Sequence, residues 1–260
     1  MYSLQILINY FIHRIGTLSG LADNTLIYDF KSNVLNKKVV HPEFRLIEKY
    51  RSELSKNSQL LEPIDLGAGT KARQKNKTIG NMAGMASVSQ GYGQLLYRLA
   101  CYYKPDKIIE LGTALGISTM YLAMGNPLAR VITVEGNPQL AEIASKSFAA
   151  KKLNNITLIN STFDDALTRL IPEINTNTLV FIDGNHTFKA TMRYFDVFGR
   201  IADGTNIMVF DDINWSQEMM LAWKNISESE HAGVLIDLFH MGILFQGWGC
   251  DKQKFRLWYS

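Results

Sequence analysis

Apolar residues fall into short β-rich runs from Lys104 onward, and stretches of helical length separate the first five of these runs. The runs are KIIEL, RVITVEG, ITLIN, LVFIDG, NIMVFDD, VLIDLFH, ILFQGW and KFRLWY. Such alternation is typical of a parallel sheet, because each parallel crossover needs a connection of helical length. The pattern therefore predicts an α/β fold with a doubly wound, mostly parallel sheet. The last two runs follow each other through a turn with glycine and aspartate, and we expect them to pair as an antiparallel edge.

The first hundred residues show helical spacing of apolar positions and no strand alternation. We therefore expect a helical N-terminal cap region over residues 1–79, followed by the α/β domain over residues 80–260. The apolar stretch YSLQILINYFI near the start is interrupted by Asn9 and ends before His13, well short of the ~20 residues that span a bilayer. No Lys or Arg precedes it, so a docking helix is favoured over a signal peptide, and no membrane partner is expected.

Composition narrows the class of protein. Of the 260 residues, 47% are hydrophobic and 20% are charged, which excludes disordered and fibrous classes and indicates a folded, water-soluble chain. The 27 basic and 24 acidic residues leave a net charge of +3, too small to indicate nucleic acid as the partner. The two cysteines show no zinc or redox spacing, so a reducing, cytoplasmic setting is expected. The basic run from Lys71 to Lys77 is interpreted as a solvated loop, with an anion-binding lid as the alternative.

Two glycine clusters compete as the ligand-binding loop, DLGAGT at residues 65–70 and ELGTALGIST at residues 110–119. The second cluster follows an apolar strand run and opens a helix. Backbone amides approach ligands at such a helix N-terminus, so the second cluster is favoured. The first follows a proline and runs into polar residues, and it is interpreted as a turn.

The favoured loop does not fit a nicotinamide dinucleotide. The fingerprint G-x-G-x-x-G would need glycine where Ala114 and Ile117 stand. What remains is Glu110 at the strand end, with Gly112 and Gly116 in a wide turn. Such a turn leaves room for a charged amino-acid tail instead of a pyrophosphate, so Gly112 and Gly116 are candidate cofactor-binding residues.

Carboxylates end three of the strand runs. Glu135 closes the second run at a carboxyl strand end, where it can accept both hydroxyls of a ribose, and an ordinary exposed acid is the alternative. Asp183 ends the fourth run, and Asp211 with Asp212 ends the fifth. Neighbouring strands lie about 4.8 Å apart, so these three aspartates are expected to meet and to need a divalent cation such as Mg²⁺. The alternative for Asp212 is a cap on the helix that follows.

Four motifs in order, ELGTALGIST, VITVEGNP, FIDGNH and FDDI, resemble the class I S-adenosylmethionine-dependent methyltransferases. More narrowly, they are similar to the metal-dependent O-methyltransferases of the catechol and macrolide-sugar type. The resemblance covers roughly residues 80 to 215 and implies a seven-stranded Rossmann-like sheet. It places Glu110, Gly112 and Ser118 around the methionine moiety of the cofactor. It also implies Glu135 on the ribose, and Phe163 with Asp164 near the adenine.

The same resemblance implies the chemistry. The metal ligands of that family stand at the positions of Asp183, Asp211 and Asp212. A basic residue three positions after the first ligand takes the hydroxyl proton, and His186 occupies that position. Histidine titrates near neutrality and suits a general base, with a purely structural role as the alternative. The catalytic set would then be His186 with Asp183.

The expected function is therefore transfer of a methyl group from S-adenosylmethionine to a small-molecule hydroxyl, assisted by Mg²⁺ or another divalent cation. A small molecule is the expected partner, and a homo-oligomer is possible. The amino-directed DNA methyltransferase motifs Asn-Pro-Pro-Tyr and Asp-Pro-Pro-Tyr do not occur, which weakens nucleic acid as the target. Two alternatives stay open: a cofactor-binding module without catalysis, and a nicotinamide oxidoreductase on the same fold.

Overall fold

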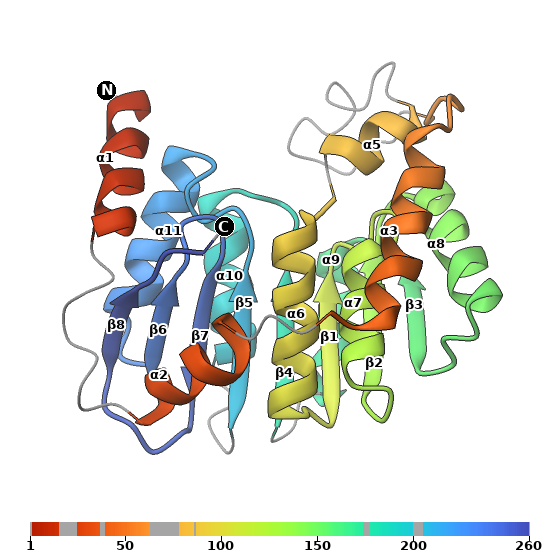
Figure 1. Cartoon of the computed structure of the whole chain (residues 1–260). Helices are drawn as coiled ribbons and strands as arrows, with labels where there is room; N and C mark the ends of the chain where they lie inside the picture. Colours follow the sequence, from red (N-terminus) through yellow and green to blue (C-terminus); the bar gives the residue numbers. More distant parts are fainter. Residues whose placement is uncertain are drawn as a thin grey trace. The chain divides into compact units, whose positions relative to one another are not determined.

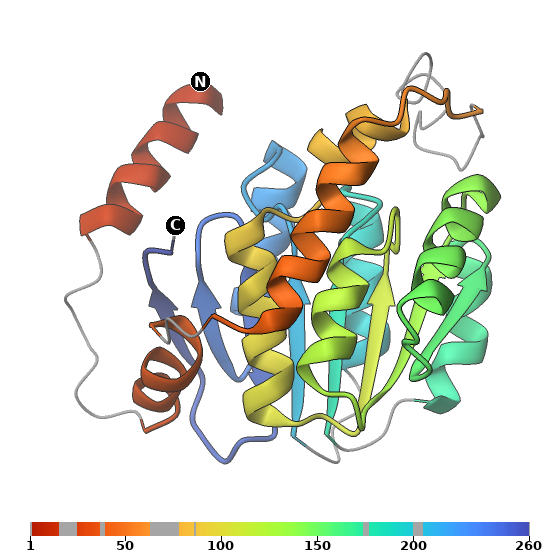
Figure 2. The same cartoon turned by 45° about the vertical axis from the view of Figure 1, so that its right-hand side comes forward.

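The structure, a computed structural model, contains two compact units (Figures 1 and 2). Unit 1 comprises residues 1–35 and 170–260, and unit 2 comprises residues 36–169. The residues that the structure describes are 2–15, 25–36, 40–62, 78–85, 87–173, 177–199 and 205–259. The predicted turn at 65–70 and the basic run from Lys71 to Lys77 lie outside the described residues.

Unit 2 is built on three parallel strands in the order β3-β2-β1. In chain order its elements are α3 (Pro42–Ser55), α5 (Ile79–Met85), α6 (Gln90–Tyr103), β1 (Lys107–Leu111), α7 (Ile117–Gly125), β2 (Arg130–Glu135), α8 (Pro138–Ala150), β3 (Ile156–Asn160) and α9 (Phe163–Leu170). Helices α6, α7 and α8 lie in front of these strands and α9 lies behind them (Figure 1). Cover on both faces explains why β1 and β2 read as nearly continuous apolar runs.

Side-chain caps and close packing fix the helices of unit 2. The Ser89 hydroxyl accepts the Tyr92 N–H at the start of α6, and Asn137 caps α8 just before its proline. Within the helix layer, Gly93 of α6 lies so close to the Tyr121 ring that an added Cβ would stand 2.4 Å from it. This contact brings α6 and α7 together and holds α7 over the strands that carry the candidate site.

Unit 1 contains five strands in the order β4-β5-β7-β6-β8. Its elements are α1 (Tyr2–Ile15), α2 (Thr25–Phe30), the π-helical turn η2 (Lys31–Leu35), the 3-10 turn η3 (Ile171–Glu173), β4 (Thr178–Ile182), α10 (Phe188–Gly199), β5 (Asn206–Phe210), α11 (Gln217–Glu228), β6 (Val234–Asp237), β7 (Gly242–Gln246) and β8 (Gln253–Arg256). Strands β4 and β5 are parallel, whereas β7 runs antiparallel to both β5 and β6.

Helices cover both faces of the unit 1 strands. Phe30 of α2 meets Phe245 of β7, with ring centroids 6.1 Å apart. On the other face the ring of Trp223 in α11 lies against Gly242, where an added Cβ would stand 2.7 Å away. Residues 242 and 245 point to opposite faces of β7, so the two contacts are on opposite sides of the sheet. The predicted α/β, doubly wound and mostly parallel class is thereby confirmed.

Two details of the predicted sheet are wrong. The described chain has eight strands rather than seven, because residues Gln253–Arg256 form β8. The last two runs were expected to pair with each other, but β8 pairs with β6, and in parallel. The physical reason is that β7 already pairs with β5 on one edge and β6 on the other, which leaves no free edge for β8.

The described part of the first hundred residues is helical, as predicted, with one isolated bridge between Leu60 and Thr78. The apolar N-terminal stretch forms α1, and its His13 is buried against β6. Of the helices described, none has the length and apolar character needed to cross a membrane. The division into a cap over 1–79 and a domain over 80–260 stays a prediction.

Candidate functional site

The loop after β1 folds over the end of β2. The N–H groups of Gly112 and Thr113 both donate to the Val134 carbonyl, at 3.0 and 3.1 Å. Gly112 (φ 112°) and Ala114 (φ 45°) both have positive φ, a region that L-residues with side chains rarely adopt. The sequence Glu-Leu-Gly-Thr-Ala thus turns sharply at the carboxyl end of two neighbouring strands.

Gly116 is required for packing. It stands at the N-cap of α7 in the left-handed conformation, φ 79°. A Cβ there would lie 2.6 Å from the Phe148 ring and 3.3 Å from the Cβ of Ala144, both in α8. The glycine therefore lets the α7 N-terminus press against α8, a reason the sequence pattern did not supply.

Glu135 ties this loop to the start of α8. The side chain is 8% exposed, and its Oε2 accepts the Ala114 N–H at 2.7 Å while Oε1 accepts the Asn137 N–H at 2.8 Å. Burial raises the pKa of Glu135, and the backbone N–H donors oppose that rise. A carboxylate offers about four acceptor positions, so acceptor capacity remains for a ligand's hydroxyls.

Glu110 lies fully buried beside Glu135, at the end of β1. Its Oε2 accepts hydrogen bonds from the hydroxyls of Thr119 and Thr133, the latter at 2.6 Å. Among the described residues no group donates to Oε1. Burial raises the pKa of Glu110, and the nearby hydroxyls, including that of Ser118, counteract the rise. An unpartnered buried carboxylate oxygen is costly, so it marks a position where a ligand's N–H donors would be stabilised.

The two residues predicted near adenine begin α9, just after β3. Asn160 Nδ2 and the Ser161 N–H both donate to the Glu135 carbonyl, at 2.7 and 3.0 Å, which draws the end of β3 to the end of β2. Phe163 is half-buried and Asp164 is exposed. All seven residues predicted to bind the cofactor therefore belong to unit 2, and Glu110, Glu135 and the loop between them adjoin one another.

The predicted acids of unit 1 gather at the ends of β4 and β5. Ile182 pairs with Phe210, and the Asp211 N–H donates to the Ile182 carbonyl at 3.0 Å, so Asp183 and Asp211 follow neighbouring strand ends. His186 joins them: its Nε2 lies 3.5 Å from Asp183 Oδ1 and 3.9 Å from Asp212 Oδ2. The structure thus brings together the four residues that the sequence predicted.

The electrostatics of this carboxylate cluster, defined as Asp183, Asp211 and Asp212, favour a cation. Burial, and then the charge of Asp212, raise the pKa of Asp211 to about 7. A hard divalent ion bound by carboxylate oxygens would relieve that repulsion, so the donor set fits such an ion chemically. In the described conformation, however, no group of three His, Cys, Asp or Glu side chains is arranged to hold a metal ion.

The alternative role of Asp212 as a helix cap is wrong. Ser216 is the N-cap of α11, and its hydroxyl accepts the Met219 N–H at 3.1 Å. Asp212 instead has a left-handed backbone, φ 56°, and its carbonyl accepts the Trp215 N–H. The carboxylate of Asp212 is consequently not committed to the helix N-terminus.

Sequence reasoning missed the threonines that hold Glu110. Thr133 is the β2 residue paired in register with Glu110, and Thr119 stands three residues into α7. A hydroxyl inside the apolar run RVITVE was the available signal, because a buried polar residue needs a partner. The partner could be named only once the strand register was known.

Residues 109–213 match the family model described as methyltransferase domain. These residues are therefore similar to a methyltransferase domain, and the match covers less than half of the chain. Every predicted site residue, from Glu110 to Asp212, falls inside the matched segment.

Two proteins to which the chain is similar are both named as catechol O-methyltransferases. The chain is 34% identical over 101 residues to catechol O-methyltransferase B of Danio rerio, covering 37% of this chain and 38% of that protein. It is 30% identical over 130 residues to catechol O-methyltransferase of Niastella koreensis, covering 49% of this chain and 58% of that protein. The chain thus spans about two fifths and three fifths of these relatives. The resemblance to class I O-methyltransferases is confirmed.

The fold is shared with solved methyltransferases. The O-methyltransferase from Bacillus cereus, determined in complex with SAH, aligns with a TM-score of 0.56 over 85% of this chain and 97% of that one. The two sequences are 18% identical, so this likeness speaks for the fold alone. It confirms the Rossmann-like arrangement that the motifs predict.

Proposed function

We propose that this protein is an S-adenosylmethionine-dependent O-methyltransferase that acts on a small-molecule hydroxyl in the cytoplasm. The observation that carries the proposal is the pair Glu110 and Glu135 at the carboxyl ends of neighbouring parallel strands, joined by the loop at Gly112. Ligands of such sheets bind outside the carboxyl strand ends. The names of the relatives support the reaction class.

Each part of the cofactor would meet a different group of side chains in unit 2. Glu110 Oε1, unpartnered among the described residues, would accept the ammonium of the methionine moiety. Glu135 would accept the ribose hydroxyls with the acceptor capacity left by its two backbone donors. Ser118 is buried beside Glu110 and would line the methionine end, while Phe163 with Asp164 would border the adenine.

The carboxylate cluster would hold Mg²⁺ or another divalent cation. When bound, such an ion lowers the pKa of the acceptor hydroxyl and helps to orient it. His186 Nε2 faces Asp183 and Asp212, and it would receive the acceptor's proton. The acceptor oxygen then forms a bond to the methyl carbon, the carbon–sulfur bond breaks, and the sulfonium becomes a neutral thioether. The protein's contribution is alignment of the two reactants and removal of one proton.

Methyl transfer tests this proposal. The full-length protein would be incubated with methyl-labelled S-adenosylmethionine, Mg²⁺ and catechol as the acceptor probe. We expect labelled methyl ether and an equal amount of S-adenosylhomocysteine. If catechol is not used, a panel of other small hydroxyl compounds is screened with the same label. Binding of the cofactor without transfer to any acceptor would instead favour a non-catalytic module.

A further inference from the structure

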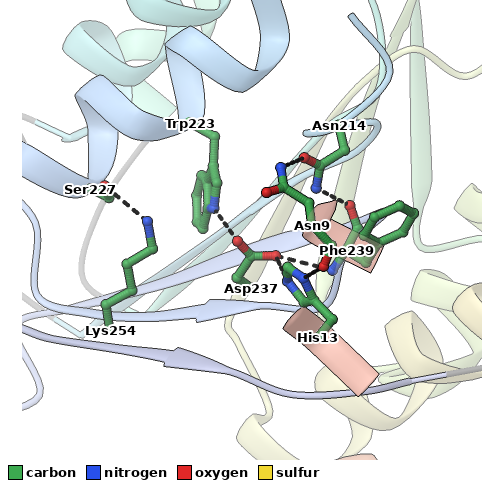
Figure 3. A network of polar contacts seen from close by, with 8 residues as sticks. All are labelled: Asn9, His13, Asn214, Trp223, Ser227, Asp237, Phe239 and Lys254. Carbon is green, nitrogen blue, oxygen red and sulfur yellow. Dashed lines mark hydrogen bonds and ion pairs between the residues drawn. The ribbon is translucent and has the colours of Figure 1, made fainter. Parts of the chain in front are cut away.

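Helix α1 is hydrogen-bonded to the loop that carries two of the proposed metal ligands. Asn9 Nδ2 donates to Asn214 Oδ1 at 3.2 Å, and Asn214 Nδ2 in turn donates to the Phe239 carbonyl at 2.7 Å (Figure 3). Asn214 stands two residues after Asp212. The two ends of this contact are 205 residues apart in the sequence, so it is a tertiary contact between α1 and the β5–α11 loop.

A buried polar clamp fixes α1 in this place. His13 is 2% exposed, with Nε2 2.6 Å from Asp237 Oδ1 and Nδ1 2.7 Å from the Asn9 carbonyl. Asp237 also accepts the Trp223 Nε1–H and the Phe239 N–H, both at 3.1 Å. Both ring nitrogens of His13 thus lie within hydrogen-bond distance of an oxygen, one in a carbonyl and one in a carboxylate. The clamp therefore joins α1, β6 and α11 around one carboxylate, as Figure 3 shows.

Backbone hydrogen bonds also hold the β5–α11 loop. The Ile213 N–H donates to the His240 carbonyl at 3.1 Å, and the Trp215 N–H donates to the Asp212 carbonyl at 2.9 Å. Asp212 and Phe239 both have left-handed backbones, φ 56° and 72°. Residues with side chains keep this conformation only where surrounding contacts impose it. Asn214, which bonds to both Asn9 and Phe239, supplies such a contact between the two strained positions.

Aromatic packing supports the same arrangement from the side of α1. The Tyr10 ring meets Phe239 edge-on at a centroid distance of 5.6 Å, and the His13 ring meets it at 5.5 Å. Phe239 is thus covered by α1 while its carbonyl holds Asn214. Helix α1 therefore contacts both partners of the Asn214–Phe239 hydrogen bond: Asn9 bonds to Asn214, and the rings of Tyr10 and His13 pack on Phe239.

We propose that Asn9 is a positioning residue for the acceptor side of the active site: through Asn214 it sets the conformation of the β5–α11 loop and hence of Asp211 and Asp212. The inference rests on the proposed function for the catalytic role of the loop. The hydrogen bond between Asn9 and Asn214 does not depend on that function. It makes α1 a part of the site's support. The cofactor residues of unit 2 share none of these hydrogen bonds, so their binding should not depend on Asn9.

Hydrogen exchange of the full-length protein tests the positioning directly. In Asn9→Ala we expect amides in peptides covering residues 211–216 to exchange roughly two- to tenfold faster, the factor for one lost hydrogen bond. Peptides covering residues 110–119 should exchange as in the wild type. Leu7→Ala is the matched control, because Leu7 lies on the same helix but is 53% exposed. It should leave both regions unchanged.

Asn214→Ala provides a second route to the same result if Asn9→Ala lowers the protein's yield. The double variant should exchange no faster in residues 211–216 than Asn214→Ala alone, since both substitutions remove one shared interaction. Unchanged exchange in this loop would overturn the inference, and so would equal acceleration in residues 110–119, which indicates general loosening.

Comparing kcat/KM with cofactor affinity tests whether the loop serves the acceptor side of the reaction. With catechol as the acceptor probe, Asn9→Ala should lower kcat/KM by a similar two- to tenfold factor and leave the affinity for S-adenosylhomocysteine unchanged. A loss of cofactor affinity as large as the loss of kcat/KM would contradict a positioning role on the acceptor side. If the wild type methylates no hydroxyl, the proposed function fails, while the exchange experiment still decides whether Asn9 positions the loop.

Discussion

Replacement of Glu135 by glutamine separates the two tasks that the structure gives this side chain. The carboxylate accepts the Ala114 N–H on one oxygen and the Asn137 N–H on the other. The amide of glutamine has one accepting oxygen, so it satisfies one donor and turns its NH₂ group toward the other. The variant thus keeps the size of the residue and removes its charge and one acceptor.

The magnitudes follow from burial and hydrogen-bond count. Leaving one buried N–H without an acceptor costs about 1 to 3 kcal/mol, and part of this is offset because the amide is cheaper to bury than the carboxylate. We therefore expect the free energy of unfolding to fall by about 1 to 2 kcal/mol. Loss of charge-assisted bonds to the ribose should weaken S-adenosylhomocysteine binding by about 1.5 to 3 kcal/mol, roughly 10- to 150-fold.

Urea unfolding and isothermal titration calorimetry with S-adenosylhomocysteine measure these two effects on the same preparation. Glu142→Gln is the matched control, because it makes the same chemical change on the exposed face of α8, where Glu142 pairs with Lys146 at 2.6 Å. The control should keep wild-type stability and affinity. Equal cofactor affinity of the wild type and Glu135→Gln would remove Glu135 from the binding site.

Three further predictions concern unit 1. Replacing His13 by alanine leaves buried Asp237 without its His13 partner, so the free energy of unfolding should fall by about 3 to 5 kcal/mol in urea titrations at pH 7. Burial raises the pKa of Asp237, but the contacts with His13, Phe239 and Trp223 together lower it below its usual value. The stability that these contacts supply is lost only as the pH falls through that lowered pKa, so acid unfolding of the variant should begin at a higher pH. Exhaustive chelation should abolish methyl transfer yet leave calorimetric binding of S-adenosylhomocysteine intact, and full activity after chelation would exclude a metal role. His186→Gln should lower the single-turnover rate at saturating Mg²⁺ by roughly 10² to 10⁴-fold, whereas a rate within about twofold of the wild type would show that His186 removes no proton.

The strands could be predicted from the sequence because a parallel sheet buried on both faces demands apolar runs with helices between them. KIIEL and ITLIN coincide with β1 and β3 residue for residue. The pairing of β8 could not be predicted, since apolar alternation tells which residues face the core but not which strand edge is free. Strand β6 pairs with β7 along one edge, and β8 pairs with its other edge.

The site was predictable where it depended on strand ends. Glu110 and Glu135 lie at the ends of apolar runs in unit 2, and the aspartates follow apolar runs in unit 1. Within each unit, parallel topology brings neighbouring strand ends to one edge. Contacts that depend on register or on distant segments were not accessible: Thr133 meets Glu110 only through the β1–β2 register. Asn9 meets Asn214 through a helix whose sequence indicates only that it docks somewhere. Gly116 was assigned to the ligand, and the Phe148 ring supplies its packing reason.

The central claim is that this chain binds S-adenosylmethionine at the ends of β1 and β2. Calorimetric titration of the full-length protein with S-adenosylhomocysteine, and separately with NAD, tests it most directly. The account predicts saturable binding of one S-adenosylhomocysteine per chain and no binding of NAD over the same concentration range. Tighter binding of NAD than of S-adenosylhomocysteine would contradict it.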